Sequence, residues 1–202
     1  PKESIVKNTL SKLRDLLPSV KKAGEDGGVL DSHGAEFLGL PEGVPVAPAE
    51  GDQPAALAGS LIAAPGQVSM SFGTSVVANS VGDRAFEGIA LPIDHFCAPD
   101  GRPINMVWLR NGTTAMNMVI NLFGGDFSAI MPQVLAADDN CGGLLALPFM
   151  DDEPGLGVSQ GGTAMVIGLN EKTATLGNAV KAMLLATVFN LRIGSNQLDE
   201  QG

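Results

Sequence analysis

Hydrophobic positions along the chain form short periodic segments that alternate between helical and strand spacing, with Gly and Pro between them. Helical spacing predicts helices over residues 3–17, 32–38, 53–64, 113–123, 128–137 and 175–193. Alternating or β-branched segments predict strands over residues 67–72, 75–78, 104–109, 144–149 and 163–167, with a further short strand considered at 44–47. Strands and helices alternate without an internal repeat, which indicates an α/β layered fold.

Two predicted turns stand out because backbone could approach a ligand closely there. Gly73-Thr74 forms the tip of a predicted hairpin between strands 67–72 and 75–78. Residues 110–113 (RNGT) join a predicted strand to a predicted helix, with Gly112 inside the turn. Residues 150–162, rich in Gly and Pro, are predicted to be a loop within one domain.

Composition narrows the classes of partner. The chain has 202 residues, 45% of them hydrophobic, which suffices for one domain or one and a half with a buried core. Its formal net charge of −10 argues against nucleic acid or an anionic membrane as partner, because both require a basic face. No basic and apolar leader and no uninterrupted apolar run of membrane-spanning length is found, so we expect a soluble, cytoplasmic protein. A start at Pro1 and an end at Gly202 suggest a piece of something larger.

Several common chemistries lack their sequence pattern. The only histidines and cysteines, His33, His95, Cys97 and Cys141, are not in metal-ligand spacing, so we predict no metal ligands and two reduced thiols. No phosphate-binding loop of the G-x-x-x-x-G-K-[ST] type occurs, and residues 155–160 lack the third glycine of a dinucleotide fingerprint. Any nucleotide site must therefore use another architecture.

Two short motifs invite alternatives that their context disfavours. Residues 157–161 match the G-x-S-x-G pattern of hydrolases, but Ser159 is preceded by a loop and both histidines come before it. Asn111-Gly112-Thr113 matches a glycosylation sequon, but a turn is the better interpretation without a secretory leader. Neither pattern predicts function here.

A carboxylate followed by a phosphate-sized turn is the most informative combination. Asp52, placed at the start of the predicted helix 53–64, could accept a proton, although Asp is also a common structural N-cap. The turn at Gly73-Thr74-Ser75 could offer N–H groups and hydroxyls to phosphate oxygens, although such residues are common in ordinary turns. Together they suggest phosphoryl transfer to a hydroxyl.

Several segments in the same order resemble the FGGY family of carbohydrate kinases, especially its xylulokinase-like branch. These segments are residues 39–46 (GLPEGVPV), 51–56 (GDQPAA) and 65–75 (PGQVSMSFGTS), followed by 147–149 (LPF), 164–169 (AMVIGL), Asn178 and 182–184 (AML). The resemblance implies an actin-like ATPase (ribonuclease H-like) lobe with a mixed sheet flanked by helices. It also implies that residues 1–202 are most of the C-terminal lobe, with the N-terminal lobe and the extreme C-terminus outside the chain.

The resemblance implies ATP-dependent phosphorylation of a keto-sugar hydroxyl, most simply of a pentulose such as xylulose, by a kinase that uses Mg²⁺. Asp52 resembles the general base, and Asp52 and Gln53 the sugar-binding residues. Gly73 and Thr74 resemble the turn that meets the γ-phosphate, and Gly112 the second nucleotide-contacting turn. The magnesium ligand is expected from the other lobe, so no metal ligand is assigned to this chain, and the chain alone is expected to be inactive.

Departures from the family pattern leave alternatives open. Leu185 replaces a usual acidic residue, Ala179 replaces a larger apolar one, and residues 151–153 (DDE) replace a common Gly-Glu-Arg. The sugar could instead be ribulose, sedoheptulose or a polyol such as glycerol. A non-catalytic ATPase-fold module that binds sugar or protein is the alternative from another class, and a homodimer is a further expectation.

Overall fold

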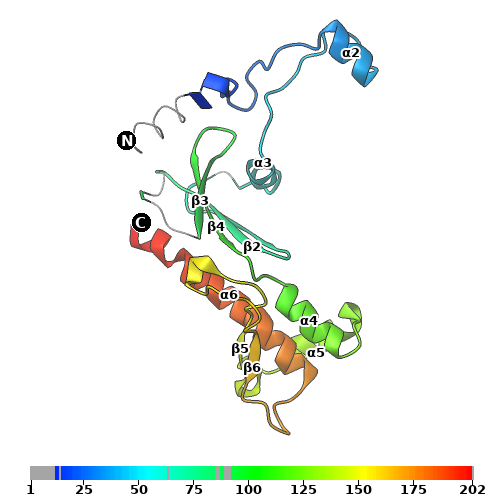
Figure 1. The fold of residues 1–202 in the computed structure, drawn as a ribbon, viewed down its shortest axis with the longest axis vertical. Coiled ribbons are helices and arrows are strands. Elements are labelled where there is room, and N and C mark those ends of the chain that lie inside the picture. Colours follow the sequence, from blue (N-terminus) through cyan, green and yellow to red (C-terminus); the bar gives the residue numbers. More distant parts are fainter. Residues whose placement is uncertain (1–11, 14, 63, 85–86, 89–91, 202) are drawn as a thin grey trace. The chain divides into compact units, whose positions relative to one another are not determined.

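The computed structural model describes residues 12–13, 15–62, 64–84, 87–88 and 92–201. The chain forms two compact units, residues 1–51 and 52–202, which are considered separately (Figure 1). All five candidate site residues lie in the second unit. Their mutual placement is therefore a property of one compact body.

Among the described residues of the first unit, one helix is complete. Helix α2 (Ser32–Leu38) begins after Asp31, which accepts a hydrogen bond from the Gly34 N–H, and ends at Gly39 with φ of 65°. The strand considered at 44–47 is only a β-bridge between Val29 and Pro45. Hydrogen bonds from the Leu30 N–H to the Val44 carbonyl and from the Val46 N–H to the Gly28 carbonyl, both at 2.9 Å, flank this bridge. The predicted helix 3–17 lies mostly outside the described residues, of which 12–13 and 15–16 are helical.

A four-stranded sheet forms the framework of the second unit. Its strands are β1 (Val68–Phe72), β2 (Val76–Val81), β3 (Ile93–Cys97) and β4 (Pro103–Leu109), in the order β1-β2-β4-β3. The expected sheet with flanking helices is present, and each of these described pairs is antiparallel. Antiparallel neighbours can be joined by the short turns found between β1 and β2 and between β3 and β4, whereas parallel ones require a long crossover.

The two faces of the sheet carry different helices. Helix α3 (Asp52–Gly59) buries Leu57 with Val81 and Ile104 on one face. Helix α6 (Leu176–Gln201) buries Leu191 against the other face, where the alternate residues Val76, Ala78, Val107 and Leu109 lie. Side-chain alternation along β2 therefore places Asn79 on the α3 face.

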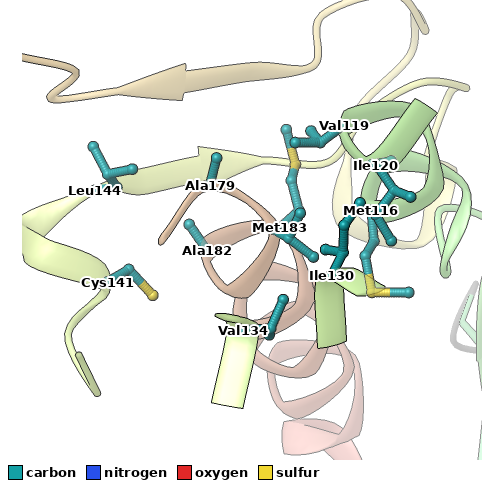
Figure 2. Packing of buried hydrophobic residues seen from close by; sticks show 12 residues of the cluster. Met116, Val119, Ile120, Ile130, Val134, Cys141, Leu144, Ala179, Ala182 and Met183 are labelled. Atoms are coloured by element: carbon teal, nitrogen blue, oxygen red, sulfur yellow. The ribbon is translucent and has the colours of Figure 1, made fainter. Parts of the chain in front are cut away.

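A second core lies where α6 continues past the sheet. Helices α4 (Thr114–Leu122) and α5 (Phe127–Ala136), the 3₁₀ turn η1 (Cys141–Gly143) and the paired strands β5 (Leu145–Leu147) and β6 (Met165–Ile167) complete this part. Figure 2 shows side chains of α4, α5 and η1 grouped around α6. The buried cluster comprises Ala115, Met116, Val119, Ile120, Ile130, Val134, Cys141, Leu144, Ala179, Val180, Ala182 and Met183.

Helix α6 also passes a length and composition test for a membrane span, over Leu176–Asn196 with a mean hydropathy of 1.2. Half of that window is buried inside the protein. Partial burial of this kind is typical of a core helix, which explains the apolar character without a bilayer.

Several predicted boundaries shift in the structure. Helix α3 ends at Gly59, before the predicted residue 64, because Leu61 adopts a positive φ of 58° and the Ile62 N–H donates back to the Leu57 carbonyl at 3.2 Å. Strands β5 and β6 are shorter than predicted, and α6 continues to Gln201. Residues 150–162 form a loop as predicted, with only the 3₁₀ turn η2 (Pro154–Leu156) and a bridge from Glu153 to Val158.

Candidate functional site

The predicted hairpin tip is confirmed and is exposed. Residues 73–75 connect β1 to β2, and the Gly73 N–H donates to the Ser75 carbonyl at 3.0 Å. The Gly73 N–H is thus used inside the turn. Within the described part of the chain, the N–H groups and hydroxyls of Thr74 and Ser75 have no protein partner. Those two residues supply the available donors at the tip.

The tip is joined to the second predicted turn by three hydrogen bonds. The Gly112 N–H donates to the Thr74 carbonyl at 2.9 Å, and the Thr113 N–H to the Gly73 carbonyl at 2.8 Å. Thr113 Oγ1 also donates to the Gly73 carbonyl, at 3.0 Å. Gly73 and Thr74, which are adjacent in the sequence, therefore form one junction with the distant Gly112.

Close packing makes glycine necessary at position 112. A Cβ atom there would lie 2.4 Å from the Gly73 carbonyl oxygen and 2.5 Å from that of Thr74, well inside van der Waals contact. Helix α6 supports the same turn, since Thr187 Oγ1 donates to the Gly112 carbonyl at 3.3 Å. The glycine thus serves the contact between the two turns.

A buried side-chain pair fixes the residue before Gly112. Glu153 Oε2 accepts from the Asn111 backbone N–H at 2.9 Å and from Asn111 Nδ2 at 3.0 Å. Asn111 Oδ1 in turn accepts from the Asp151 N–H at 2.8 Å. Asn111 and Glu153 are each 2% exposed. Burial of the amide supports the turn interpretation of residues 111–113 over a glycan acceptor.

Sequence reasoning missed this Asn111–Glu153 pair. Glu153 was noted only as part of a departure from the family pattern, in a loop that gave no periodic signal. Arg110 and Asp152 add an ion pair between the same two segments, and both side chains are partly exposed. The loop at 150–162 therefore braces the turn that contacts the hairpin tip.

Asp52 and Gln53 lie at the start of α3, on the opposite side of the hairpin strands from α6. Asp52 is the first residue of the helix and not the residue before it, and its carboxylate accepts from the Gln53 N–H at 2.9 Å. The side chain is exposed, so it is accessible to a ligand. Its predicted position at a helix N-terminus holds, and one oxygen caps the helix.

Gln53 ties this helix start to the sheet. Its Oε1 accepts from Asn79 Nδ2 at 2.9 Å. Asn79 is 5% exposed, and its Oδ1 is buried without a partner among the described residues. An unpaired buried acceptor of this kind costs about 1–3 kcal/mol. Sequence reasoning also missed Asn79, whose signal was an amide inside an otherwise apolar strand.

The structure does not bring Asp52 into contact with the hairpin tip within the described residues. Asn79, where α3 is tied to β2, lies four residues along the strand from Ser75, about 13 Å at roughly 3.3 Å per residue. The candidate residues thus form two groups along one hairpin. Asp52 and Gln53 are at one end, and Gly73, Thr74 and Gly112 at the other.

Other candidate chemistries stay apart in the structure. Ser159 is exposed in the loop, without the strand before and the helix after it that a hydrolase elbow requires. Cys97 is exposed and Cys141 buried, both as free thiols. His95 Nδ1 lies 3.1 Å from Asn105 Oδ1. Within the described ranges, no group of three or more His, Cys, Asp or Glu side chains is arranged to hold a metal ion.

Two departures from the family pattern lie in the core and not at the candidate site. Ala179 belongs to the buried cluster around α6, and Leu185 packs against that cluster. An apolar side chain suits this environment, where an acid would lose its hydration. These two substitutions therefore change the packing of α6 and leave the hairpin tip untouched.

Comparisons with known proteins find relatives that are similar in sequence. No family model matches the chain. It is 25% identical to the xylulose kinase of Haemophilus influenzae over 190 residues, which is 93% of this chain and 38% of that protein. It is 33% identical to the xylulose kinase of Streptomyces coelicolor over 179 residues, 87% of this chain and 34% of that protein. The chain thus spans between a third and two fifths of these relatives.

Solved structures show the same fold. The crystal structure of xylulose kinase from Rhodospirillum rubrum superposes with a TM-score of 0.78 at 19% identity, covering 92% of this chain and 38% of that one. The curated relatives supply the similarity in sequence, and the solved structure supplies the similarity in fold. The resemblance to the FGGY family of carbohydrate kinases, and to xylulose kinases in particular, is confirmed, and the chain has the actin-like ATPase fold of these proteins.

Proposed function

We propose that the protein carrying this chain transfers the γ-phosphoryl group of ATP to a hydroxyl of a keto sugar, most simply a pentulose such as xylulose. Its curated relatives are named xylulose kinases, and the chain covers 38% and 34% of their lengths. Residues 1–202 would then form most of the C-terminal lobe. The other lobe and the extreme C-terminus, including the adenine contacts, would lie outside this chain.

The junction of the two turns is the observation that carries the proposal. The N–H groups of Gly112 and Thr113 donate hydrogen bonds to the carbonyls of Thr74 and Gly73, which therefore face protein and not the ligand. The N–H groups and hydroxyls of Thr74 and Ser75 have no partner in the described residues and are exposed. Fixed donors of this kind suit the oxygens of a transferring phosphoryl group, because they need no reorganisation as charge develops.

The two glycines of the junction would have different roles. The Gly73 N–H already bonds Ser75, so Gly73 would serve by allowing the phosphate to approach closely and not by donating. Gly112 would serve by admitting the hairpin tip against its own turn. Thr74, together with Ser75, would contact the γ-phosphate directly.

Asp52 would act as the general base and Gln53 as its sugar-binding neighbour. The Asp52 side chain is exposed at the start of α3, where an acceptor hydroxyl can reach it. It would take the hydroxyl proton as the oxygen attacks phosphorus, an effect typically worth about 10²–10⁴-fold in rate. Both ends of the hairpin belong to one compact unit, so the bound sugar and the triphosphate together would have to span the distance from Asp52 to the phosphate turn.

When bound, magnesium would neutralise part of the charge on the ATP phosphates. The described residues offer no cluster of three acidic or other metal-binding side chains. As the family resemblance implies, the protein ligand would come from the other lobe, and no step is assigned to the metal through this chain. A cytoplasmic location and a homodimer remain predictions.

A substrate panel tests the proposal. The full-length protein is assayed by coupled ADP release with xylulose, ribulose, sedoheptulose, glycerol and gluconate, and the 202-residue chain is assayed in parallel. We expect the highest kcat/KM with a pentulose and no turnover by the 202-residue chain alone. No sugar-dependent ADP release from the folded full-length protein would support the non-catalytic alternative and contradict the proposal.

A further inference from the structure

The amide of Gln53 has two chemically different ends, and only one can face a ligand. Its Oε1 is engaged, because Asn79 Nδ2 donates to it at 2.9 Å. No described residue accepts a hydrogen bond from Gln53 Nε2. The free end of the Gln53 side chain therefore presents donors and no acceptor.

Among the described residues, the hydrogen bond to Gln53 is the one interaction that explains an amide side chain at position 79. Asn79 lies on the same face of β2 as Val77 and Val81 and is 5% exposed. Its Oδ1 is buried and makes no hydrogen bond among the described residues. An apolar side chain would fill this site and leave no acceptor unpaired. What asparagine adds at this position is the hydrogen bond to Gln53.

We propose that Asn79 is a positioning residue that fixes the orientation of the Gln53 amide, so that the substrate site beside Asp52 presents hydrogen-bond donors at this point and no acceptor. This inference rests on the proposed function and specifies its substrate recognition. A sugar carbonyl oxygen only accepts hydrogen bonds, whereas a hydroxyl both donates and accepts. Recognition of the keto sugar therefore depends on this orientation, whereas the corresponding alditol can bind a donor or an acceptor.

Exchanging the amide of Asn79 for a carboxylate should reverse the orientation of the Gln53 amide. In Asn79→Asp the carboxylate can only accept, so Gln53 must turn its Nε2 toward β2 and present Oε1 to the ligand. A carbonyl oxygen then faces an acceptor, while a hydroxyl can still donate to it. Asp and Asn have nearly the same size, which keeps the packing on the α3 face.

Gln53→Glu is the matched second variant, acting from the other side of the same bond. The glutamate still accepts from Asn79 Nδ2, but it presents a second acceptor oxygen to the ligand. It should therefore reproduce the effect of Asn79→Asp by an independent change. It also keeps the test decisive if Asn79→Asp does not fold.

The experiment compares a keto sugar with its alditol in the full-length protein. The wild type and both variants are measured for kcat and KM with xylulose, and for inhibition by xylitol and arabinitol through their Ki values. In both variants we expect the KM for xylulose to rise at least tenfold, kcat to stay within about threefold, and each Ki to change less than threefold. Circular dichroism melting confirms that each variant is folded.

Equal changes for ketose and alditols would overturn the inference, and so would a Gln53→Glu protein with wild-type KM. A fall in kcat with unchanged KM would likewise overturn it, because a misplaced amide should weaken ground-state recognition of the carbonyl. Failure of the wild type to phosphorylate any sugar is a separate outcome. It would overturn the proposed function together with this inference.

Discussion

The backbone N–H of Gly112 donates to the carbonyl of Thr74 at 2.9 Å, which joins the turn before α4 to the tip of the β1–β2 hairpin. The carbonyls of the tip are held against protein by this bond and its neighbours. The unpartnered donors of Thr74 and Ser75 remain for a ligand. A local feature of one hairpin thus depends on a glycine in a distant segment.

Replacing Gly112 by Ala should damage this junction. The new Cβ would lie 2.4 Å from the Gly73 carbonyl oxygen and 2.5 Å from that of Thr74, so one turn must shift. Overpacking of this kind costs about 1–3 kcal/mol. We expect that loss in the free energy of unfolding from urea denaturation, together with at least a tenfold weaker ATP affinity in the full-length protein.

Gly73→Ala is the matched control for Gly112→Ala. Its Cβ would meet only the Ser75 carbonyl, at 3.5 Å, which is an ordinary contact. We expect its stability to stay within about 0.5 kcal/mol of wild type, while ATP affinity falls because the methyl group stands where the phosphate would approach. Equal stability of the two alanine variants would contradict the steric account of Gly112.

Glu153 should contribute to stability through Asn111. Glu153→Ala leaves the Asn111 N–H and Nδ2 without their shared acceptor in a buried site, at a cost of about 3 kcal/mol. Glu153→Gln keeps an acceptor oxygen and should cost about 1 kcal/mol. Urea unfolding of both variants measures the difference. A Glu153→Ala protein as stable as wild type would show that the pair does not brace the turn.

Thr74→Ala should separate ligand contact from turn stability. The Thr74 hydroxyl has no partner among the described residues, so its loss should leave the free energy of unfolding within about 0.5 kcal/mol. ATP affinity and kcat should fall together, because the hydroxyl would contact the transferring phosphoryl group. In the control Thr113→Val, loss of the bond from Oγ1 to the Gly73 carbonyl should instead lower stability by about 1 kcal/mol. Unchanged kinetics in Thr74→Ala would remove Thr74 from the site.

The buried thiol of Cys141 should make stability fall at alkaline pH. Burial raises the pKa of Cys141, and nearby Lys181 offsets this only in part. The unfolded chain then loses the thiol proton first, so this contribution is complete below the ordinary cysteine pKa of about 8.5 and is lost as pH rises through the higher folded pKa. The free energy of unfolding should decline by at most about 1.4 kcal/mol per pH unit from this group.

The chain has no tyrosine to titrate in the same range, which simplifies this measurement. Urea unfolding between pH 8 and 10 should show a shallower decline in Cys141→Ala than in wild type. Cys97 is exposed on β3, so Cys97→Ala is the control and should keep the wild-type slope. Equal slopes in wild type and Cys141→Ala would contradict the prediction.

The elements predicted well were those with a strong local signal. The alternating segments on either side of Gly73-Thr74 predicted the hairpin and its tip, and apolar helical spacing predicted α4, α5 and α6. Strand β3 was missed because only Ile93 at its start is buried, while its other residues, including Phe96, are exposed at the sheet edge. An edge strand of this kind lacks the alternation of apolar and polar residues by which a strand is predicted from sequence.

The site was predictable only as separate parts. Asp52, Gln53, Gly73, Thr74 and Gly112 came from local motifs and from resemblance to a family. The bond between Gly112 and Thr74 and the pairing of Asn111 with Glu153 join segments that are distant in sequence, and no local pattern encodes such partners. Asn79 was missed for the same reason, since its role depends on a partner from α3.

Asp52→Asn tests the central claim most directly. In the full-length protein the amide can no longer accept the sugar proton, while its oxygen can still accept from the Gln53 N–H as in wild type. Asp126→Asn is the matched control, because Asp126 caps α5 through the Ser128 N–H at 2.9 Å, in a helix outside the candidate site. Both variants should keep the wild-type melting temperature and ATP affinity.

The decisive measurement is kcat for sugar phosphorylation in these two variants. The account predicts a fall of about 10²–10⁴-fold in Asp52→Asn and an unchanged kcat in Asp126→Asn. A kcat within tenfold of wild type in a folded, ATP-binding Asp52→Asn protein would contradict the assignment of Asp52 as the general base.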